Sequence, residues 1–295
     1  MKKNRVRLGV LAVSFMALGL AYFVSPPAAE AQAVFSVKFF GGYNYLMGGD
    51  LNNGLKGQLD LMTAFGAAVG YSAQGSYQPV HFALDVGGDV IFKLTPVVSV
   101  GAGIGYIETQ SSPTQISLNH PVWTAVTLRQ DPKVTAIPVR ASLFFFIPLG
   151  ARVNLTIQAG AAYYLAKMHS VYNQAEASDW NQAEIKAEGM GYGFHGGLGL
   201  EILLASNLSL VVEGTGKYAQ VGNFSGTTTW SSSGGSSHSE QGTLYYFQNT
   251  LFPLGTYPLL TMSSAAPSGF GISDVREARI DFSGFTAQAG LLVKF

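Results

Sequence analysis

Seven charged residues stand singly within stretches of apolar and small side chains: Lys38, Asp85, Asp89, Arg140, Glu201, Glu213 and Lys217. Isolated charges in an apolar setting are costly, so these groups must pair with one another or reach water. We predict that they form an ion-pair network centred on Arg140, with the four carboxylates as its candidate partners. The network is either a structural plug or part of a gated or proton-linked pathway.

Other residues that could do chemistry lack the arrangement that the chemistry needs. His169-Ser170 and His238-Ser239-Glu240 lie in segments predicted as loops, where nothing holds a base against a nucleophile. The five histidines show no metal-ligand spacing, and there is no cysteine. The glycine runs GAGIG and GMGYGFHGGLG lack the strand–turn–helix context of a nucleotide loop. The sequence therefore predicts no catalytic site, no metal and no cofactor.

The last eleven residues, Phe285 to Phe295, show most clearly what positions these charges. They read FTAQAGLLVKF, so that every second residue from Phe285 onward is apolar and the residues between are smaller or more polar on average. A period of two indicates a strand with two different faces. Eleven residues also match the length that a tilted strand needs to cross a bilayer.

The same alternation recurs along the chain. Residues 35–45 predict a first strand, and three hairpins follow with short turns at Thr95-Pro96-Val97, Pro148-Leu149-Gly150 and Ala205-Ser206-Asn207. With the C-terminal strand they make eight strands, and we predict an all-β, up-and-down antiparallel transmembrane β-barrel. The segments GTLYYFQN and GTYPLLTMS predict a further hairpin, which either extends the barrel above the membrane or raises the count to ten.

Long connections are expected at the end opposite the short turns, over 48–77, 110–132, 168–189 and 222–276. Apolar residues at helical spacing behind Asp50, a possible helix cap, predict a short helix in the first of them. The tract 225–243 is rich in Ser, Thr and Gly and is expected to be mobile.

Trp123, Trp180 and Trp230 each fall in a different long connection. Their rings either pack on one another or on the barrel rim, or form a contact surface for a binding partner.

Aromatic residues stand near both ends of the outward face. The long-loop end carries Tyr43, Tyr45, Tyr106, Tyr163, Tyr192 and Tyr218, and the short-turn end carries Phe35, Phe92, Phe145 and Phe295. We interpret these two sets as girdles at the two membrane interfaces. On this interpretation the inward positions, including the seven isolated charges, face the lumen.

The beginning of the chain predicts export. Residues 1–33 combine a basic start, an apolar run from Leu8 to Val24 and the small-residue stretch AAEAQA, which is typical of a secretory signal cleaved after Ala31 or Ala33. An uncleaved membrane anchor is the alternative. The barrel domain would then comprise residues 34–295. Only 12% of residues are charged and the net charge is zero, which removes any electrostatic case for nucleic acid as a partner.

In its topology, aromatic girdles and terminal Phe295, the predicted barrel resembles the small OmpA/OmpX-type and OmpW-type outer-membrane proteins. The resemblance implies a monomer in the bacterial outer membrane, surrounded by lipid and lipopolysaccharide and assembled by machinery that recognises the C-terminal strand. It implies a structural or interaction role through extracellular loops that contact an unidentified ligand. The alternative that the resemblance offers is an OmpW-like conduit for small apolar solutes or a narrow gated pore.

Overall fold

A computed structural model describes residues 35–110 and 113–295. The predicted signal segment, 1–33, lies outside the described residues. Among the residues described, no helix is both long enough and apolar enough to cross a membrane.

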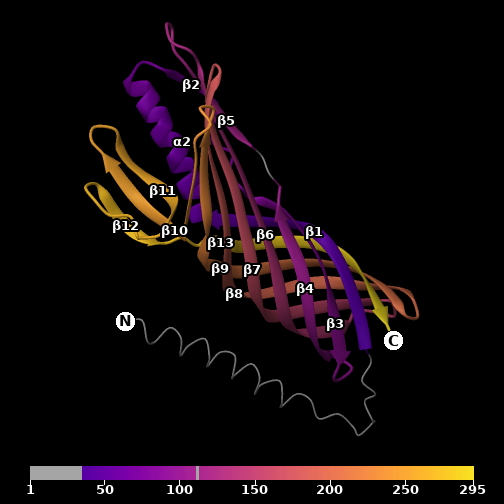
Figure 1. The fold of residues 1–295 in the computed structure, drawn as a ribbon. Coiled ribbons are helices and arrows are strands. Elements are labelled where there is room, and N and C mark those ends of the chain that lie inside the picture. The colour runs from indigo at the N-terminus through magenta and orange to yellow at the C-terminus, as the bar shows by residue number, and fades with distance from the viewer. Residues whose placement is uncertain (1–34, 111–112) are drawn as a thin grey trace. The chain divides into compact units, whose positions relative to one another are not determined.

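Eight antiparallel strands form a closed ring (Figure 1). Each strand pairs with its neighbours in the order β1-β3-β4-β6-β7-β8-β9-β13, and β13 pairs again with β1. The predicted eight-stranded barrel is therefore confirmed. The strands are β1 (Phe35–Gly49), β3 (Phe82–Lys93), β4 (Val98–Thr109), β6 (Val126–Pro148), β7 (Val153–Glu176), β8 (Asp179–Ala205), β9 (Leu208–Ser232) and β13 (Ile280–Lys294).

The two faces of the ring follow the alternation in the sequence. Phe39 of β1 lies opposite Leu291 of β13, and both side chains are exposed on the outer surface. The flanking residues Lys38, Phe40 and Leu292 point inward and are buried. The apolar set predicted to face lipid is thus the outer set, because a period of two fixes both faces at once.

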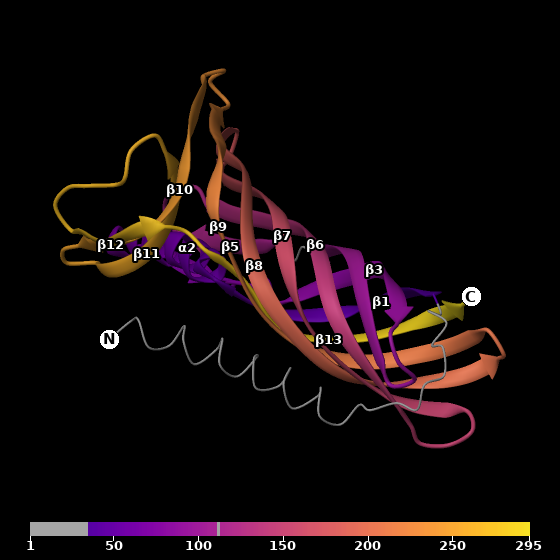
Figure 2. The same cartoon turned by 90° about the horizontal axis from the view of Figure 1, so that it is seen from below.

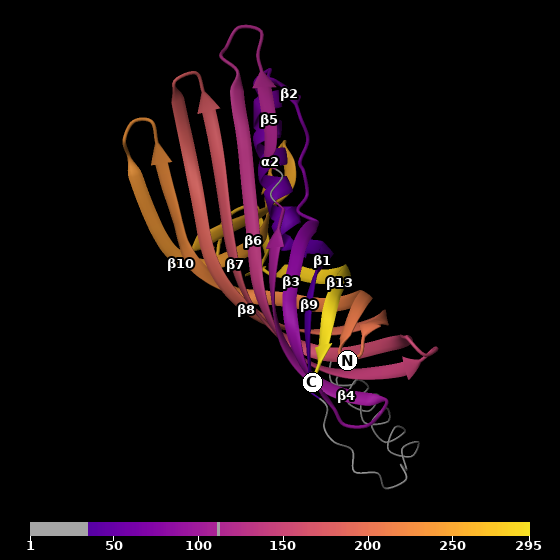
Figure 3. The ribbon, with the colours of Figure 1, turned by 90° about the vertical axis from the view of Figure 1, so that its right-hand side faces the viewer.

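Strands β6 to β9 are much longer than the ring requires, with 23 to 27 residues each. A tilted strand crosses a bilayer in roughly 9–11 residues. The excess projects as three hairpins beyond the ring, which stand side by side in Figure 3. We call residues 114–135, 167–188 and 222–243 the crown. The long loops predicted over much of these segments are wrong, because the chain there continues as paired strands.

The Ser/Thr/Gly tract expected to be mobile also forms strands. Residues 225–231 of β9 pair with 237–243 at the start of β10 (Ser237–Leu251). Its threonines are β-branched and favour extended backbone. A Cβ at Gly226 would lie 1.9 Å from the carbonyl oxygen of Lys186, and one at Gly242 would lie 2.1 Å from the backbone of Ser263. These glycines permit close strand contact rather than flexibility.

The remaining elements gather at the crown end of the ring. They are the helix α2 (Asp50–Ala68), β2 (Ser72–Gln74), β5 (Thr114–Asn119), β10, β11 (Gly255–Ser263) and β12 (Ile272–Glu277). The β10–β11 hairpin lies outside the ring, so it does not make ten strands, and β12 pairs with the other edge of β10 (Figure 2). The predicted helix is present and has 19 residues.

Asp50 does not cap the helix as expected. The N-cap residue is Gly49, and Asp50 is the first helical residue. Its carboxylate instead accepts hydrogen bonds from the Arg276 guanidinium of β12, with Nη2 at 2.7 Å, and from the Arg279 backbone at 2.9 Å. The Arg276 guanidinium in turn lies 4.4 Å from the ring centre of Tyr246. Asp50 therefore fastens the start of α2 to the segment that leads into β13.

The helix packs on β11 through glycines. Gly54 and Gly57 lie three residues apart on one face of α2, where a Cβ at Gly54 would lie 2.4 Å from Leu260 and one at Gly57 would lie 1.8 Å from the Pro258 carbonyl oxygen. Leu51 and Leu55 enter the main apolar core together with Leu244 and Met262 of the hairpin. The helix and the hairpin thus close the crown end of the ring as one packed unit.

We expect Gly57→Ala to destabilise this unit, although alanine is the better helix former by about 1 kcal/mol. The new methyl group cannot fit without moving the Pro258 backbone, and overpacking of this kind costs about 1–3 kcal/mol. The measurement is limited proteolysis of the β10–β11 hairpin in the folded chain. Asn53→Ala, at an exposed position on the same helix, is the matched control and should leave the hairpin resistant; equal cleavage of both variants would contradict the packing role of Gly57.

Candidate functional site

The lumen contains a layer of paired charges. The Lys38 ammonium lies 3.0 Å from an Asp89 oxygen and 3.1 Å from a Glu213 oxygen, and all three side chains are buried. Arg140 reaches the other oxygen of Asp89 at 3.2 Å. Lys217 lies 3.5 Å from Asp85. Three cations therefore face three carboxylates in what we call the charged layer, and its formal charge is zero.

The strand register brings these groups together, and neighbouring glycines leave room for them. Lys38 of β1 lies directly opposite Asp89 of β3, and Glu213 of β9 lies opposite Gln288 of β13, whose amide donates a 2.6 Å hydrogen bond to it. A Cβ at Gly103 would lie 1.9 Å from the Asp89 carboxylate, and one at Gly199 would lie 2.6 Å from Glu213. The lumen-facing glycines thus provide the space that the carboxylates occupy.

The structure differs from the predicted network in its centre and in one member. Arg140 contacts the single carboxylate of Asp89, whereas Lys38 bridges two carboxylates on different strands. Glu201 lies apart, near the short turns, where it pairs with Lys294 and accepts hydrogen bonds from Asn154 at 2.9 Å and Ser209 at 2.7 Å. Of the four candidate partners of Arg140, the structure selects Asp89, and the sequence pattern alone does not make this choice because partners on non-adjacent strands depend on the stagger of the whole ring.

Apolar side chains border the charged layer on both sides. Toward the short turns, Ile91, Phe144, Val211 and Leu292 form a buried cluster. Toward the crown, Ile107, Tyr164 and Phe282 belong to the main core, which continues to α2. The rings of Phe40 and Phe144 lie within 5.4 Å of the Lys38 ammonium and add cation–π contacts. The middle of the ring is therefore filled by its own side chains.

Two cavities with room for more than one water molecule lie within the described part of the ring. The one inside the charged layer has a volume of about 40 Å³, enough for about two or three water molecules, since each needs roughly 10–15 Å³. The other, of about 350 Å³, lies at the short-turn mouth beside Lys93, Glu201 and Lys294. The apolar cluster around Phe144 lies between them.

A serine–histidine pair inside the charged layer was not predicted. Ser142 Oγ lies 2.9 Å from His195 Nε2, across β7. The residue between them in register is Gly160, where a Cβ would lie 2.7 Å from the His195 ring. The hairpin turns fix this row of three residues, so strand register could have revealed it. The adjoining cavity of about 40 Å³ has room for water-sized molecules only, so a larger substrate does not reach this pair.

His169 and His238, the two histidines that stand beside a serine in the sequence, contact other residues instead. His169 Nε2 lies 2.7 Å from Glu184 on the crown, and the His238 ring stacks on Trp230. Glu240 accepts hydrogen bonds from Ser263 and Ser264. Neither segment aligns its own serine with its histidine. In the described part of the chain, no three His, Asp or Glu side chains could hold a metal ion together.

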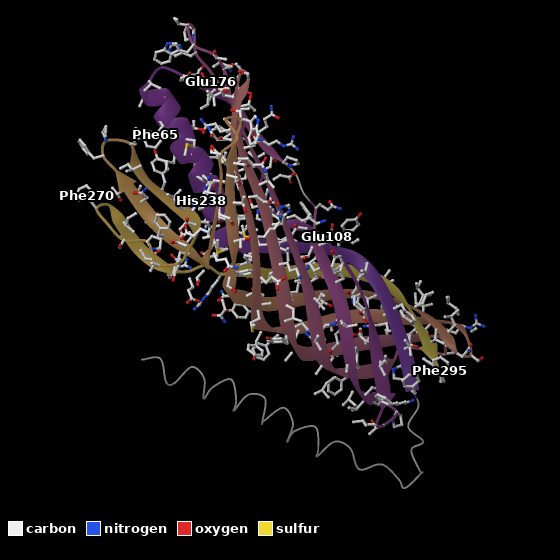
Figure 4. All side chains as sticks on the ribbon, viewed as in Figure 1. Phe65, Glu108, Glu176, His238, Phe270 and Phe295 are labelled. Atoms are coloured by element: carbon white, nitrogen blue, oxygen red, sulfur yellow. The ribbon has the colours of Figure 1, made fainter. Side chains whose placement is uncertain are left out.

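The aromatic residues lie in two groups on the outer surface. Tyr43, Tyr45, Tyr106, Tyr192 and Tyr218 are exposed toward the crown, with Tyr163 partly buried against Tyr192 at 5.1 Å between ring centres. At the other end Phe35 lies 5.5 Å from Phe92 and 5.6 Å from Phe295. Figure 4 labels Phe295 at this end and Glu176 at the opposite tip.

The tryptophans are not all in loops. Trp123 lies between β5 and β6, where it stacks on His120 at 4.2 Å and lies 6.0 Å from Tyr71. Trp180 belongs to β8 and Trp230 to β9, so placing these two in loops was wrong. The reason is that the strands extend far beyond the ring. Trp123 and Trp230 pack on histidine or tyrosine rings rather than on other tryptophans.

The ring and its filled lumen define a small closed β-barrel with a large crown. No protein-family model matches the chain, and no curated protein sequence does. Among solved structures, the outer membrane protease OmpT from Escherichia coli is similar over 92% of this chain and 99% of that chain, with 11% sequence identity and a TM-score of 0.33. A likeness of this strength supports no inference about this chain, whose barrel is established by its own strand pairing.

We expect Lys38→Met to lower the free energy of unfolding by about 3–5 kcal/mol, because it leaves two buried carboxylates short of a counter-charge. Arg140→Met should cost less, since Asp89 keeps Lys38 as a partner. Lys56→Met removes an exposed ion pair on α2 and should cost about 0–1 kcal/mol. Urea unfolding followed by gel mobility of the folded and unfolded forms measures all three. A larger effect of Arg140→Met would return Arg140 to the centre of the network.

Proposed function

We propose that the chain is a bacterial outer-membrane barrel that does not conduct and that presents its crown outside the cell as a binding surface. The observation that carries this proposal is the filled lumen, in which apolar clusters enclose a neutral layer of paired charges. An eight-stranded ring is just wide enough for its side chains to fill. The function of the chain would therefore be binding by the crown, and neither transport through a pore nor catalysis.

The placement in a membrane is supported by the outer surface of the ring. Exposed apolar side chains such as Phe39, Ile104 and Leu291 cover the ring between the two groups of aromatic residues. A soluble barrel would place polar residues there. In the proposed orientation the short turns face the periplasm, and lipid and lipopolysaccharide surround the apolar band. The barrel-assembly machinery would recognise β13 together with Phe295. The assembled barrel would be a monomer.

The alternative is an OmpW-like conduit for small apolar solutes. Such a path needs an open apolar lumen, whereas Lys38, Asp89 and Glu213 cross this one. The two proposals therefore differ in a measurable property of the purified chain, its conductance.

In planar bilayers, we expect the refolded chain without residues 1–33 to show no steady single-channel current. A variant with both Lys38→Ala and Phe144→Ala removes side chains from the charged layer and from the apolar cluster beside it, and should open more often than the wild type. The variant shows that the assay can detect an open lumen. Steady current through the wild-type chain would overturn the non-conducting proposal in favour of the conduit.

We expect Leu291→Lys to lower the free energy of unfolding in lipid by about 2–4 kcal/mol, the cost of a lysine near the bilayer midplane. Leu291 pairs with Phe39, halfway between Phe35 and Tyr43 along β1. Val122→Lys is the matched control, because Val122 is 83% exposed in the crown and should remain in water. The readout is urea unfolding in lipid vesicles. A lysine tolerated equally at both positions would contradict the membrane placement.

A further inference from the structure

The inner side of the crown contains a groove of about 360 Å³. One wall is Gln58 of α2, and the others come from β7, β8, β9 and the start of β10. His238, labelled in Figure 4, lies in this groove with Trp230 of the neighbouring strand. The groove is separate from the charged layer, because it is built from crown residues and from the helix that closes the ring.

The groove differs in charge from other parts of the crown. Its lining in the described structure contains serine, asparagine, glutamine and aromatic side chains, with no Asp, Glu, Lys or Arg. Elsewhere on the crown, Lys167 pairs with Glu188 and Lys186 pairs with Glu184, each with about 2.6–2.7 Å between the charged atoms. A neutral lining selects against a phosphorylated or sulfated ligand, whose charge would lose water without gaining a counter-charge.

One buried polar group in the groove has no hydrogen-bond partner in the described part of the chain. The Tyr172 hydroxyl is buried and makes no hydrogen bond within the described chain. Burial raises the pKa of Tyr172 to about 12, so the hydroxyl stays protonated and can donate at physiological pH. A buried polar group without a partner is costly and requires an explanation. Asn181 and Ser237, which are exposed, and Gln182, which is half-buried, also line the groove with polar side chains.

An aromatic surface completes the groove. Trp230 and His238 are cross-strand partners whose rings lie 5.6 Å apart and 17° from parallel. Trp230 is 37% exposed, so part of the indole is open to a ligand. An aromatic face attracts the C–H-rich face of a sugar ring, while neutral hydroxyls and amides bind its hydroxyl groups. Both kinds of group converge here.

We propose that this groove binds a neutral saccharide, with a sugar ring on Trp230 and its hydroxyl groups against Tyr172 and Asn181. The volume lies at the lower end of the range for small-ligand sites, roughly 300–1,000 Å³. This proposal names the class of ligand for the crown and rests on the proposed function of the crown as a binding surface. The same chemistry could come from a free glycan outside the cell or from the sugar chain of lipopolysaccharide in the same membrane.

The experiment uses the folded chain in detergent, titrated with oligomers of α-glucose, β-glucose and N-acetylglucosamine, with delipidated lipopolysaccharide and with dextran sulfate. Tryptophan fluorescence and calorimetry report binding. We expect at least one neutral sugar to bind and to quench fluorescence, and Trp230→Ala to weaken its binding at least tenfold. Tyr172→Phe, which removes only the hydroxyl, should weaken binding severalfold. Binding confined to lipopolysaccharide sugar or to free glucans assigns the source.

Trp180→Ala is the matched control, because Trp180 lies in the same crown but does not line the groove. It should bind as the wild type does, and folding of every variant is checked by gel mobility. The proposal is overturned if no neutral sugar binds at millimolar concentration, if dextran sulfate binds best, or if Trp180→Ala weakens binding as much as Trp230→Ala. Sugar binding is measured independently of conductance, so failure here leaves the non-conducting barrel to its own test.

Discussion

The contact of Lys38 with Asp89 and Glu213 is the constraint on which the interior of the barrel depends. It joins β1, β3 and β9, and β1 itself pairs with the C-terminal strand. A buried ammonium without a counter-charge would be far too costly, so the two carboxylates must lie where the register puts them. The glycines around them follow from the same requirement, since a side chain at Gly103 would occupy the space of the Asp89 carboxylate and one at Gly199 that of the Glu213 side-chain stem. The apolar clusters on either side then exclude bulk water and keep the pairs intact.

Much of the ring could be predicted from the sequence because its strands alternate with a period of two. Residues such as Phe39 and Leu291 could be assigned to the outer face without any knowledge of the neighbouring strands. The turns around Pro96, Pro148 and Asn207 set the hairpins in the same way, because each turn is local. The list of lumen charges followed directly, since fixing one face of a strand fixes the other.

The pairing of those charges and the crown could not be predicted in this way. Whether Arg140 meets Asp89 or Glu201 depends on the stagger of strands around the whole ring, which no local pattern encodes. In the β9 part of the crown, residues 225–229 are serine, glycine and threonine only, so the stretch before Trp230 has no apolar alternation to reveal a strand. Asp50 showed the same limit: its local signal favoured a cap, but Arg276, distant in the sequence, provides its partner.

The strand pairing of the crown restricts how this surface can change during evolution. A loop can gain or lose residues singly, but one residue added within β8 or β9 of the crown would turn every side chain beyond it to the opposite face. Unless a β-bulge took up the extra residue, a residue added in β9 before Trp230 would turn the indole to the outward face. Single residues can be added or lost without disturbing the pairing at the hairpin tips near 120–125, 177–178 and 233–236. Elsewhere the crown can diversify by substitution, by matched two-residue changes in partner strands, or by a bulge such as the one between Gly222 and Ser225, where β9 has one residue more than β8.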